Sequence, residues 1–192
     1  YENKFKLQHE IIEALTSKRT ITNFFEETLS FVCETSSNKS NIEDNSDLTR
    51  QRAKLVANWM TGELFSNLNK ESIEITESKI KPHKLAILLI KLEDATLSNK
   101  TAKELFDIVW NGDTSSIEDI IRLRGLSQIQ NNDELTEFIE TVVGKNSKMV
   151  EEIKNGKDKA LNSLVGQVMG ATKGRANPQT VRELLITKIN VK

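Results

Sequence analysis

The residue types that carry out most protein chemistry are sparse in this chain of 192 residues. Cys33 is the only cysteine and lies within an apolar run, which favours a core position over a nucleophile. His9 and His83 are far apart, with no acidic or cysteine partner at the spacing of metal ligands. No phosphate-loop, dinucleotide-binding or esterase motif occurs. The residues alone therefore do not predict a complete enzyme.

A basic stretch near the end of the chain offers a different chemistry. Asn177 and Pro178 are typical of a helix start, and Lys173 and Arg175 lie just before it. The first turn of a helix presents amide groups and a positive dipole, which favour anions such as phosphate. The two cations could equally be a solvated turn, and their spacing does not decide between these alternatives.

Charge is distributed unevenly along the chain. The net charge is −1, but residues 145–192 contain ten basic and four acidic side chains, and the remainder is acidic. A basic end indicates a polyanionic partner, with a lysine-rich solvated surface as the simpler alternative. No aromatic residue follows Phe138, so we expect contacts with a phosphate backbone rather than stacking on bases.

Helical periodicity dominates the segments that must position these residues. Apolar residues recur at intervals of three and four over residues 50–69, 83–92 and 101–110. Residues 72–76 alternate, but without a partner strand they favour an extended connector. The sequence therefore predicts an all-α fold, and it contains no apolar run long enough to cross a membrane.

Two interruptions organise the chain. Residues 34–49 are rich in Ser, Asn, Asp and Glu, which predicts a mobile loop, and Gly125 breaks the helical pattern. We predict a helical domain over residues 1–124 and a small helical tail domain over residues 125–192. Because the first residue is Tyr1, we expect a fragment of a longer protein.

Glycines and asparagines shape the predicted tail helices. We expect Asn146 to cap one helix and the next to begin at Lys157, with Leu161, Leu164, Val165 and Val168 facing inward. Gly166 and Gly170 lie on one face of that second helix, and their spacing predicts the close approach of a neighbouring backbone.

The segment LVGQVMGATKGRANPQTVRELL (164–185) resembles the C-terminal signature of the GatB/YqeY family, which includes the GatB subunit of the aspartyl/glutamyl-tRNA amidotransferase. Further blocks agree in order, among them ANWMTGELFSNLN (57–69) and DATLSNKTAKELF (94–106), and the resemblance covers roughly residues 10–189. The chain departs from the usual family pattern at Ala95, Asn99 and Ser147, where glycine, glycine and proline are common. These departures put turn details in doubt more than function.

The resemblance implies a helical domain followed by a YqeY-like tail. The intact enzyme converts Glu-tRNA(Gln), and in many organisms Asp-tRNA(Asn), into the amidated form with ATP and with ammonia from glutamine. In the family, ATP and Mg²⁺ bind a cradle domain that precedes these residues, and a separate amidase subunit hydrolyses glutamine. The resemblance therefore implies no catalytic residue, metal or cofactor in this segment. Its partners would be tRNA(Gln), the amidase subunit of the complex and one small further subunit, and no membrane.

Five basic residues are the candidates for tRNA contact when the resemblance is carried over by position. They are Lys154, Lys157, Lys159, Lys173 and Arg175. The alternative is a module for subunit–subunit assembly without direct tRNA binding, and a free-standing YqeY-like protein is disfavoured by the long helical part. The Asn, Ser, Lys and Ile bias and the long segment 34–49 favour a yeast mitochondrial form in the matrix, with the bacterial cytoplasm as the alternative.

Overall fold

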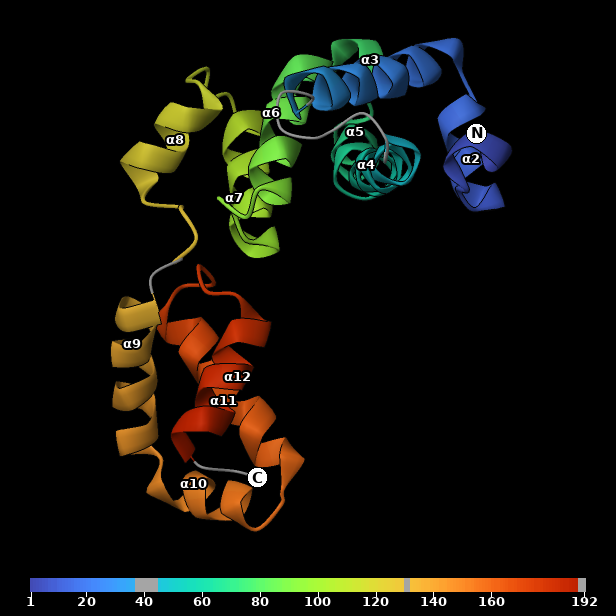
Figure 1. Ribbon diagram of the computed structural model, residues 1–192. Helices are drawn as coiled ribbons and strands as arrows, with labels where there is room; N and C mark the ends of the chain where they lie inside the picture. Colours follow the sequence, from blue (N-terminus) through green and yellow to red (C-terminus); the bar gives the residue numbers. More distant parts are fainter. Residues whose placement is uncertain (37–44, 130–131, 190–192) are drawn as a thin grey trace. The chain divides into compact units, whose positions relative to one another are not determined.

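The computed structural model describes residues 1–36, 45–129 and 132–189, and within these ranges the chain is helical and contains no strand (Figure 1). The predicted all-α fold is therefore confirmed. The chain divides into two compact units: unit 1 comprises Tyr1–Asp94 and Ala102–Asp119, and unit 2 comprises Ala95–Thr101 and Ile120–Lys192. The chain enters unit 2 for the second time at Ile120, close to the domain boundary predicted after residue 124. The sequence did not suggest that residues 95–101 cluster with the tail.

Unit 1 is built around two helices, α3 and α6, which pack against each other. Apolar side chains spaced by three and four residues along α6 fill its core, where Leu85, Leu88 and Leu89 are inaccessible to solvent. Burying each of these leucines contributes about 1.5–3 kcal/mol. The helices of this unit are α1 (Glu2–Phe5), α2 (His9–Thr16), α3 (Arg19–Ser36), α4 (Asn45–Trp59), α5 (Phe65–Glu71), α6 (Pro82–Glu93) and most of α7 (Asn99–Trp110).

A five-residue π-helical segment, η3 (Met60–Leu64), joins α4 to α5 without a break in the helical backbone. The wider turn of a π-helix accommodates one extra residue per turn. Met60 and Leu64, at its two ends, are both fully buried, whereas Gly62 faces open space. The extra residue therefore lies on the exposed side, and the apolar residues on both flanks remain in the core.

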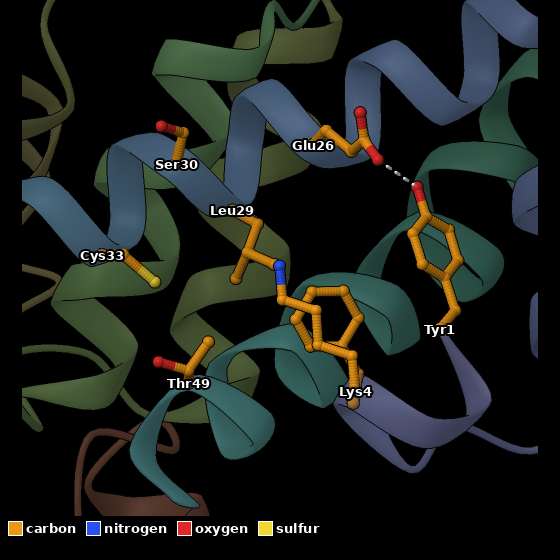
Figure 2. A pocket seen from close by; sticks show the side chains of 8 residues that line it. Tyr1, Lys4, Glu26, Leu29, Ser30, Cys33 and Thr49 are labelled. Carbon is orange, nitrogen blue, oxygen red and sulfur yellow. Dashed lines mark hydrogen bonds between the residues drawn. The ribbon is translucent and has the colours of Figure 1, made fainter. Parts of the chain in front are cut away.

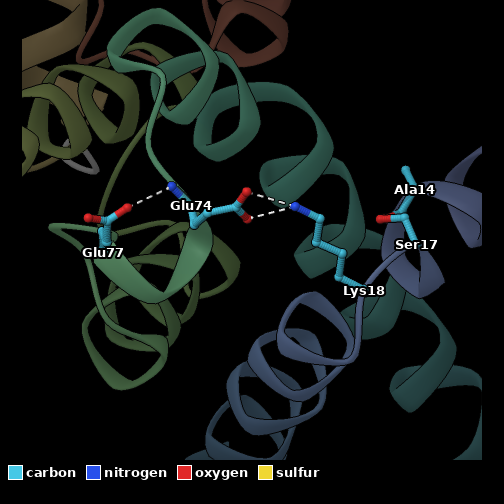
Figure 3. Close-up of polar contacts among 5 residues, drawn as sticks. All are labelled: Ala14, Ser17, Lys18, Glu74 and Glu77. Atoms are coloured by element: carbon cyan, nitrogen blue, oxygen red, sulfur yellow. Dashed lines mark hydrogen bonds and ion pairs between the residues drawn. The ribbon is translucent and has the colours of Figure 1, made fainter.

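A polar contact connects the junction of α2 and α3 with the segment before α6 (Figure 3). The amine of Lys18 donates to both carboxylate oxygens of Glu74 at 2.7 and 2.9 Å. The backbone N–H of Glu74 donates to Glu77 Oε2 at 3.1 Å, completing a capping box at the short 3₁₀ turn η4 (Ile75–Glu77). Residues 72–76 thus form no strand, as predicted, but they are not one extended connector, because Ser72 is left-handed and residues 75 and 76 belong to this turn. Because Lys18 and Glu74 are both more than half exposed, their ion pair contributes little stability.

Unit 2 contains four helices in succession, α9 (Asn132–Lys145), α10 (Ser147–Lys154), α11 (Asp158–Ala171) and α12 (Pro178–Ile189), which pack on one another (Figure 1). Its core takes one apolar stripe from each helix, and Leu164, Val168 and Leu185 are inaccessible to solvent. The predicted inward residues of the tail are confirmed. Helix α8 (Ile117–Arg124) begins in unit 1 and ends in unit 2.

Two local predictions need correction or restriction. Asn146 occupies the position before α10, but its side chain makes no capping bond. Its Nδ2 donates instead to Val142 O and to Gln167 Oε1, both at 2.8 Å, so it connects α9 to α11. The loop predicted over residues 34–49 is helical at both described ends, and its central residues, 37–44, lie outside the described ranges.

Candidate nucleic-acid interface

The basic turn, residues 172–176, joins α11 to α12. The N–H groups of Lys173 and Gly174 donate to Gly170 O at 3.0 Å and Met169 O at 2.8 Å, which satisfies carbonyls at the end of α11. Both residues have left-handed backbones, with φ of +53° at Lys173 and +79° at Gly174. Lys173 is held in a conformation that costs about 1 kcal/mol for a residue with a Cβ. The turn therefore has a defined conformation that places Lys173 at the surface.

Only one of the two predicted cations in this turn is unpaired. Lys173 is exposed and has no charged or hydrogen-bonding partner for its amine among the described residues. The guanidinium of Arg175 is partly buried, with Nη2 4.0 Å from Glu134 Oε1 of α9. Lys173 is therefore the stronger candidate for an external anion, because Arg175 already has a carboxylate neighbour.

The first turn of α12 does not offer the free amides that the sequence suggested. Asn177 Oδ1 accepts hydrogen bonds from the N–H of Gln179 at 2.8 Å and of Thr180 at 3.4 Å, and Pro178 has no N–H. The predicted helix start at Asn177 and Pro178 is confirmed. Of the two alternatives that the sequence left open, phosphate binding by these amides is the less favoured, because the cap that begins the helix also occupies its donors.

The other three candidates surround the junction of α10 and α11. Lys154 is the last residue of α10, Lys157 directly precedes α11, and Lys159 is the second residue of α11, which begins one residue later than predicted. All three are exposed. The amine of Lys157 lies 3.2 Å from Glu152 Oε1, whereas Lys154 and Lys159 have no such partner within the described ranges.

The five candidates therefore form two groups at opposite ends of α11. That helix contains 14 residues, and at 1.5 Å per residue it separates the groups by about 20 Å. One phosphate cannot contact both groups. A ligand that uses them all must present anions along an extended surface, as a nucleic acid backbone does.

The exposed face of α11 between the two groups contradicts the packing role predicted for its glycines. Gly166 and Gly170 are exposed, and a Cβ built at either position meets nothing within 4 Å. No neighbouring backbone therefore requires glycine there. The same face presents Asn162, Ser163 and Gln167, so it is polar but uncharged.

Sequence reasoning missed the segment that contacts the basic turn within unit 2. Ser98 Oγ donates to Gly174 O at 2.6 Å, and the side chain of Lys100 occupies the space beside the Gly174 Cα. The N–H of Ile129 donates to Arg175 O at 2.9 Å. No sequence spacing could signal these contacts, since the hydrogen bond from Ser98 spans 76 positions.

Other candidate chemistry falls in unit 1 and resolves into structural contacts. His9 Nε2 lies 3.3 Å from Glu13 Oε1, and the imidazole of His83 meets the ring of Phe31 edge to face at 5.2 Å. No group of three or more His, Cys, Asp or Glu suited to a metal ion occurs in the described part of the chain. Burial raises the pKa of the Cys33 thiol, so the thiolate is disfavoured.

Cys33 borders an open pocket of about 330 Å³ in unit 1 (Figure 2). Tyr1 lines another part of it, and its hydroxyl donates to Glu26 Oε1 at 2.8 Å. Burial, and then this hydrogen bond to Glu26, raise the pKa of the Tyr1 hydroxyl. The Tyr1 hydroxyl and the Cys33 thiol therefore both favour their protonated forms near neutral pH. Among the described helices, none combines the length and apolar character needed to cross a bilayer.

Known proteins resemble this chain over most of its length. The model of the GatB domain family matches residues 42–189. Proteins named as the B subunit of aspartyl/glutamyl-tRNA(Asn/Gln) amidotransferase are 45% identical over 138 residues in Neisseria meningitidis serogroup B and 45% identical over 141 residues in Paraburkholderia phymatum. Each alignment covers 72% of this chain but only 29% of the relative. The chain thus spans less than a third of these relatives, and it belongs to the GatB domain family.

Proposed function

We propose that this chain is the tRNA-contacting C-terminal part of the GatB subunit of a glutamyl-tRNA(Gln) amidotransferase. The whole enzyme would convert Glu-tRNA(Gln) to Gln-tRNA(Gln) with ATP and glutamine. The observation that carries the proposal is the family match over residues 42–189, together with the names of the amidotransferase relatives. In this proposal the segment positions tRNA and performs no bond-forming step itself.

The basic residues of unit 2 support a backbone-reading role. Unit 2 contains 13 basic and 8 acidic side chains, a net charge of +5, whereas unit 1 is net acidic. Lys154 and Lys159 at one end of α11, and Lys173 at the other, are exposed and unpaired among the described residues. Lysines in this state can exchange counterions for phosphates without first breaking an internal ion pair. Lys157 and Arg175 would contribute less, because each has an acidic neighbour.

The remaining parts of the enzyme are assigned to other polypeptide regions. ATP and Mg²⁺ would bind a domain that precedes these residues, and glutamine hydrolysis would belong to the amidase subunit. A small third subunit would complete the complex. We propose the mitochondrial matrix as the location, with the bacterial cytoplasm as the alternative, on the compositional bias described above.

A titration of the chain with unmodified tRNA(Gln) across a range of salt concentrations tests the proposal. Each phosphate contact changes the slope of log K against log salt by about −0.7 to −0.9. Three to five contacts therefore predict a slope of roughly −2 to −4.5. Absence of binding even at about 50 mM salt would contradict the proposal.

Matched substitutions assign the binding to the two lysine groups. Lys159→Ala and Lys173→Ala should each weaken binding and reduce the magnitude of the slope by about one contact. Lys54→Ala is the control, because Lys54 is also an exposed helical lysine but belongs to unit 1. If the three variants behave alike, the two lysine groups are not the binding surface.

The alternative function is assembly of the complex. It is favoured by the acidic neighbours of two candidate cations, because Lys157 lies beside Glu152 and Arg175 lies beside Glu134. Cations that already have acidic neighbours have less charge to offer a polyanion. Co-purification with the amidase subunit separates the two functions. An assembly module would bind that partner and show no tRNA affinity, whatever the salt concentration.

A further inference from the structure

Gly174 is enclosed by a side chain from a distant part of the sequence. A Cβ placed on Gly174 would lie 2.3 Å from Lys100 Cδ and 3.2 Å from both Cγ and Cε. The aliphatic part of Lys100 therefore crosses the Gly174 Cα so closely that a larger residue at position 174 would have to displace the Lys100 side chain. Its amine is one bond beyond Cε, so the charge of Lys100 lies beside the basic turn.

Ser98 fixes this arrangement from the same segment. Its hydroxyl donates to Gly174 O at 2.6 Å and accepts the N–H of Thr101 at 3.2 Å, in the first turn of α7. Thr101 Oγ1 in turn accepts the N–H of Ser98 at 3.0 Å. Each of these polar groups is therefore satisfied. These hydrogen bonds fix the backbone on both sides of the Lys100–Gly174 contact, from Ser98 to Thr101 on one side and in the basic turn on the other.

We propose that Lys100 is a further phosphate-contacting residue, which forms one anion-binding surface with Lys173. This inference rests on the proposed function, since tRNA supplies the phosphates. Lys100 is exposed, and its amine has no carboxylate or other partner among the described residues. It differs in this respect from Arg175, whose guanidinium lies beside Glu134.

Both the charge of Lys100 and the position of its aliphatic part favour the binding of a phosphate. A free lysine loses rotamer entropy when its side chain is immobilised. Contact with Gly174 already restricts the stem, so less freedom remains to be lost when the amine binds a phosphate. The glycine thus serves two purposes, because it permits the left-handed turn and leaves room for Lys100.

Binding of labelled, unmodified tRNA(Gln) to the full chain across salt concentrations tests the proposal. Lys100→Met keeps the aliphatic stem and removes the charge. It should weaken binding about 3- to 10-fold at low salt and reduce the slope magnitude by about 0.7 to 0.9. Lys100→Arg should restore both quantities. Lys54→Met, the control in unit 1, should change neither.

Protection from lysine acetylation gives a second measurement that needs no substitution. With tRNA bound, acetylation of Lys100 and Lys173, read by mass spectrometry, should fall together, whereas Lys54 stays reactive. An unaltered slope in Lys100→Met, or an unprotected Lys100 beside a protected Lys173, overturns the inference and leaves the proposed function intact. If the unsubstituted chain does not bind tRNA, both are overturned.

Discussion

The indole Nε1 of Trp110 donates a 2.7 Å hydrogen bond to Glu71 Oε1, across 39 positions of sequence. The amine of Lys79 reaches the same oxygen at 2.7 Å and lies 5.6 Å from the Trp110 ring centroid. One carboxylate oxygen therefore connects the end of α5 to the end of α7 in unit 1. Lys79, and then Trp110, lower the pKa of Glu71, because both stabilise the charged carboxylate.

This contact predicts a pH dependence that Trp110 itself reports. A folded-state pKa below the unfolded value contributes stability above the unfolded pKa, and this stability is lost as the pH falls through the folded pKa. We therefore expect native tryptophan fluorescence to change at a pH below the ordinary glutamate range. Glu71→Gln should remove this transition and Glu74→Gln should retain it. A transition at the ordinary glutamate pKa would show that the contact does not form in solution.

Two glycines of the tail should respond in opposite directions to the same substitution. Gly174→Ala forces a Cβ onto a φ of +79° and into the Lys100 side chain, and should destabilise the chain by roughly 1–3 kcal/mol. Gly166→Ala meets open space within α11 and should stabilise it by about 0.5–1 kcal/mol. Urea unfolding monitored by circular dichroism measures both. Equal effects would contradict the difference in backbone and surroundings.

Ala95 occupies a backbone conformation that suits glycine better. Its φ is +59°, which costs about 1–2 kcal/mol for a residue with a Cβ. Ala95→Gly removes that strain but increases the freedom of the unfolded chain, so we expect a net gain of about 0.5–1 kcal/mol in the free energy of unfolding. Ala171→Gly, at the exposed end of α11, is the matched control and should destabilise. A loss of stability in Ala95→Gly would argue against the left-handed turn.

Neutralising one acidic residue should strengthen tRNA binding if the proposed function holds. Glu152 lies 3.2 Å from the Lys157 amine, so Glu152→Gln frees that cation and removes a charge that repels phosphate. We expect affinity to rise about 2- to 5-fold at low salt and the gain to disappear at about 1 M salt, where the Debye length is about 3 Å. Glu77→Gln in unit 1 provides the comparison. An unchanged affinity in Glu152→Gln would place Lys157 outside the contact surface.

The helices of the tail were predictable because their signals are local. Apolar spacing identified the stripe on α11 that contains Leu164 and Val168, and Asn177 with Pro178 marked the start of α12. Spacing alone does not reveal what lies opposite a residue. For this reason the interval between Gly166 and Gly170 suggested a packed neighbour where the surface is open.

The candidate site was only partly predictable, because its chemistry depends on pairings between distant residues. The sequence identified Lys173 but could not show that Arg175 meets Glu134 or that Lys100 crosses Gly174. It also suggested both an Asn177 cap and free amides after it, which are incompatible because the same N–H groups cannot serve both. Whether Lys154, Lys157 and Lys159 contact tRNA stays a prediction.

The π-helical segment η3 gives the chain a place where its length can change by one residue. Each residue of an α-helix turns the chain by about 100°, so one residue inserted into a regular helix would rotate everything after it by that angle. The wider turn of η3 takes up the additional residue instead, and Leu68 on α5 remains buried. Deleting Gly62 would let α4 and α5 continue as one regular α-helix with nearly the same residues facing the core. A one-residue deletion here should therefore cost less stability than a one-residue deletion in the middle of α4, where no wide turn can compensate.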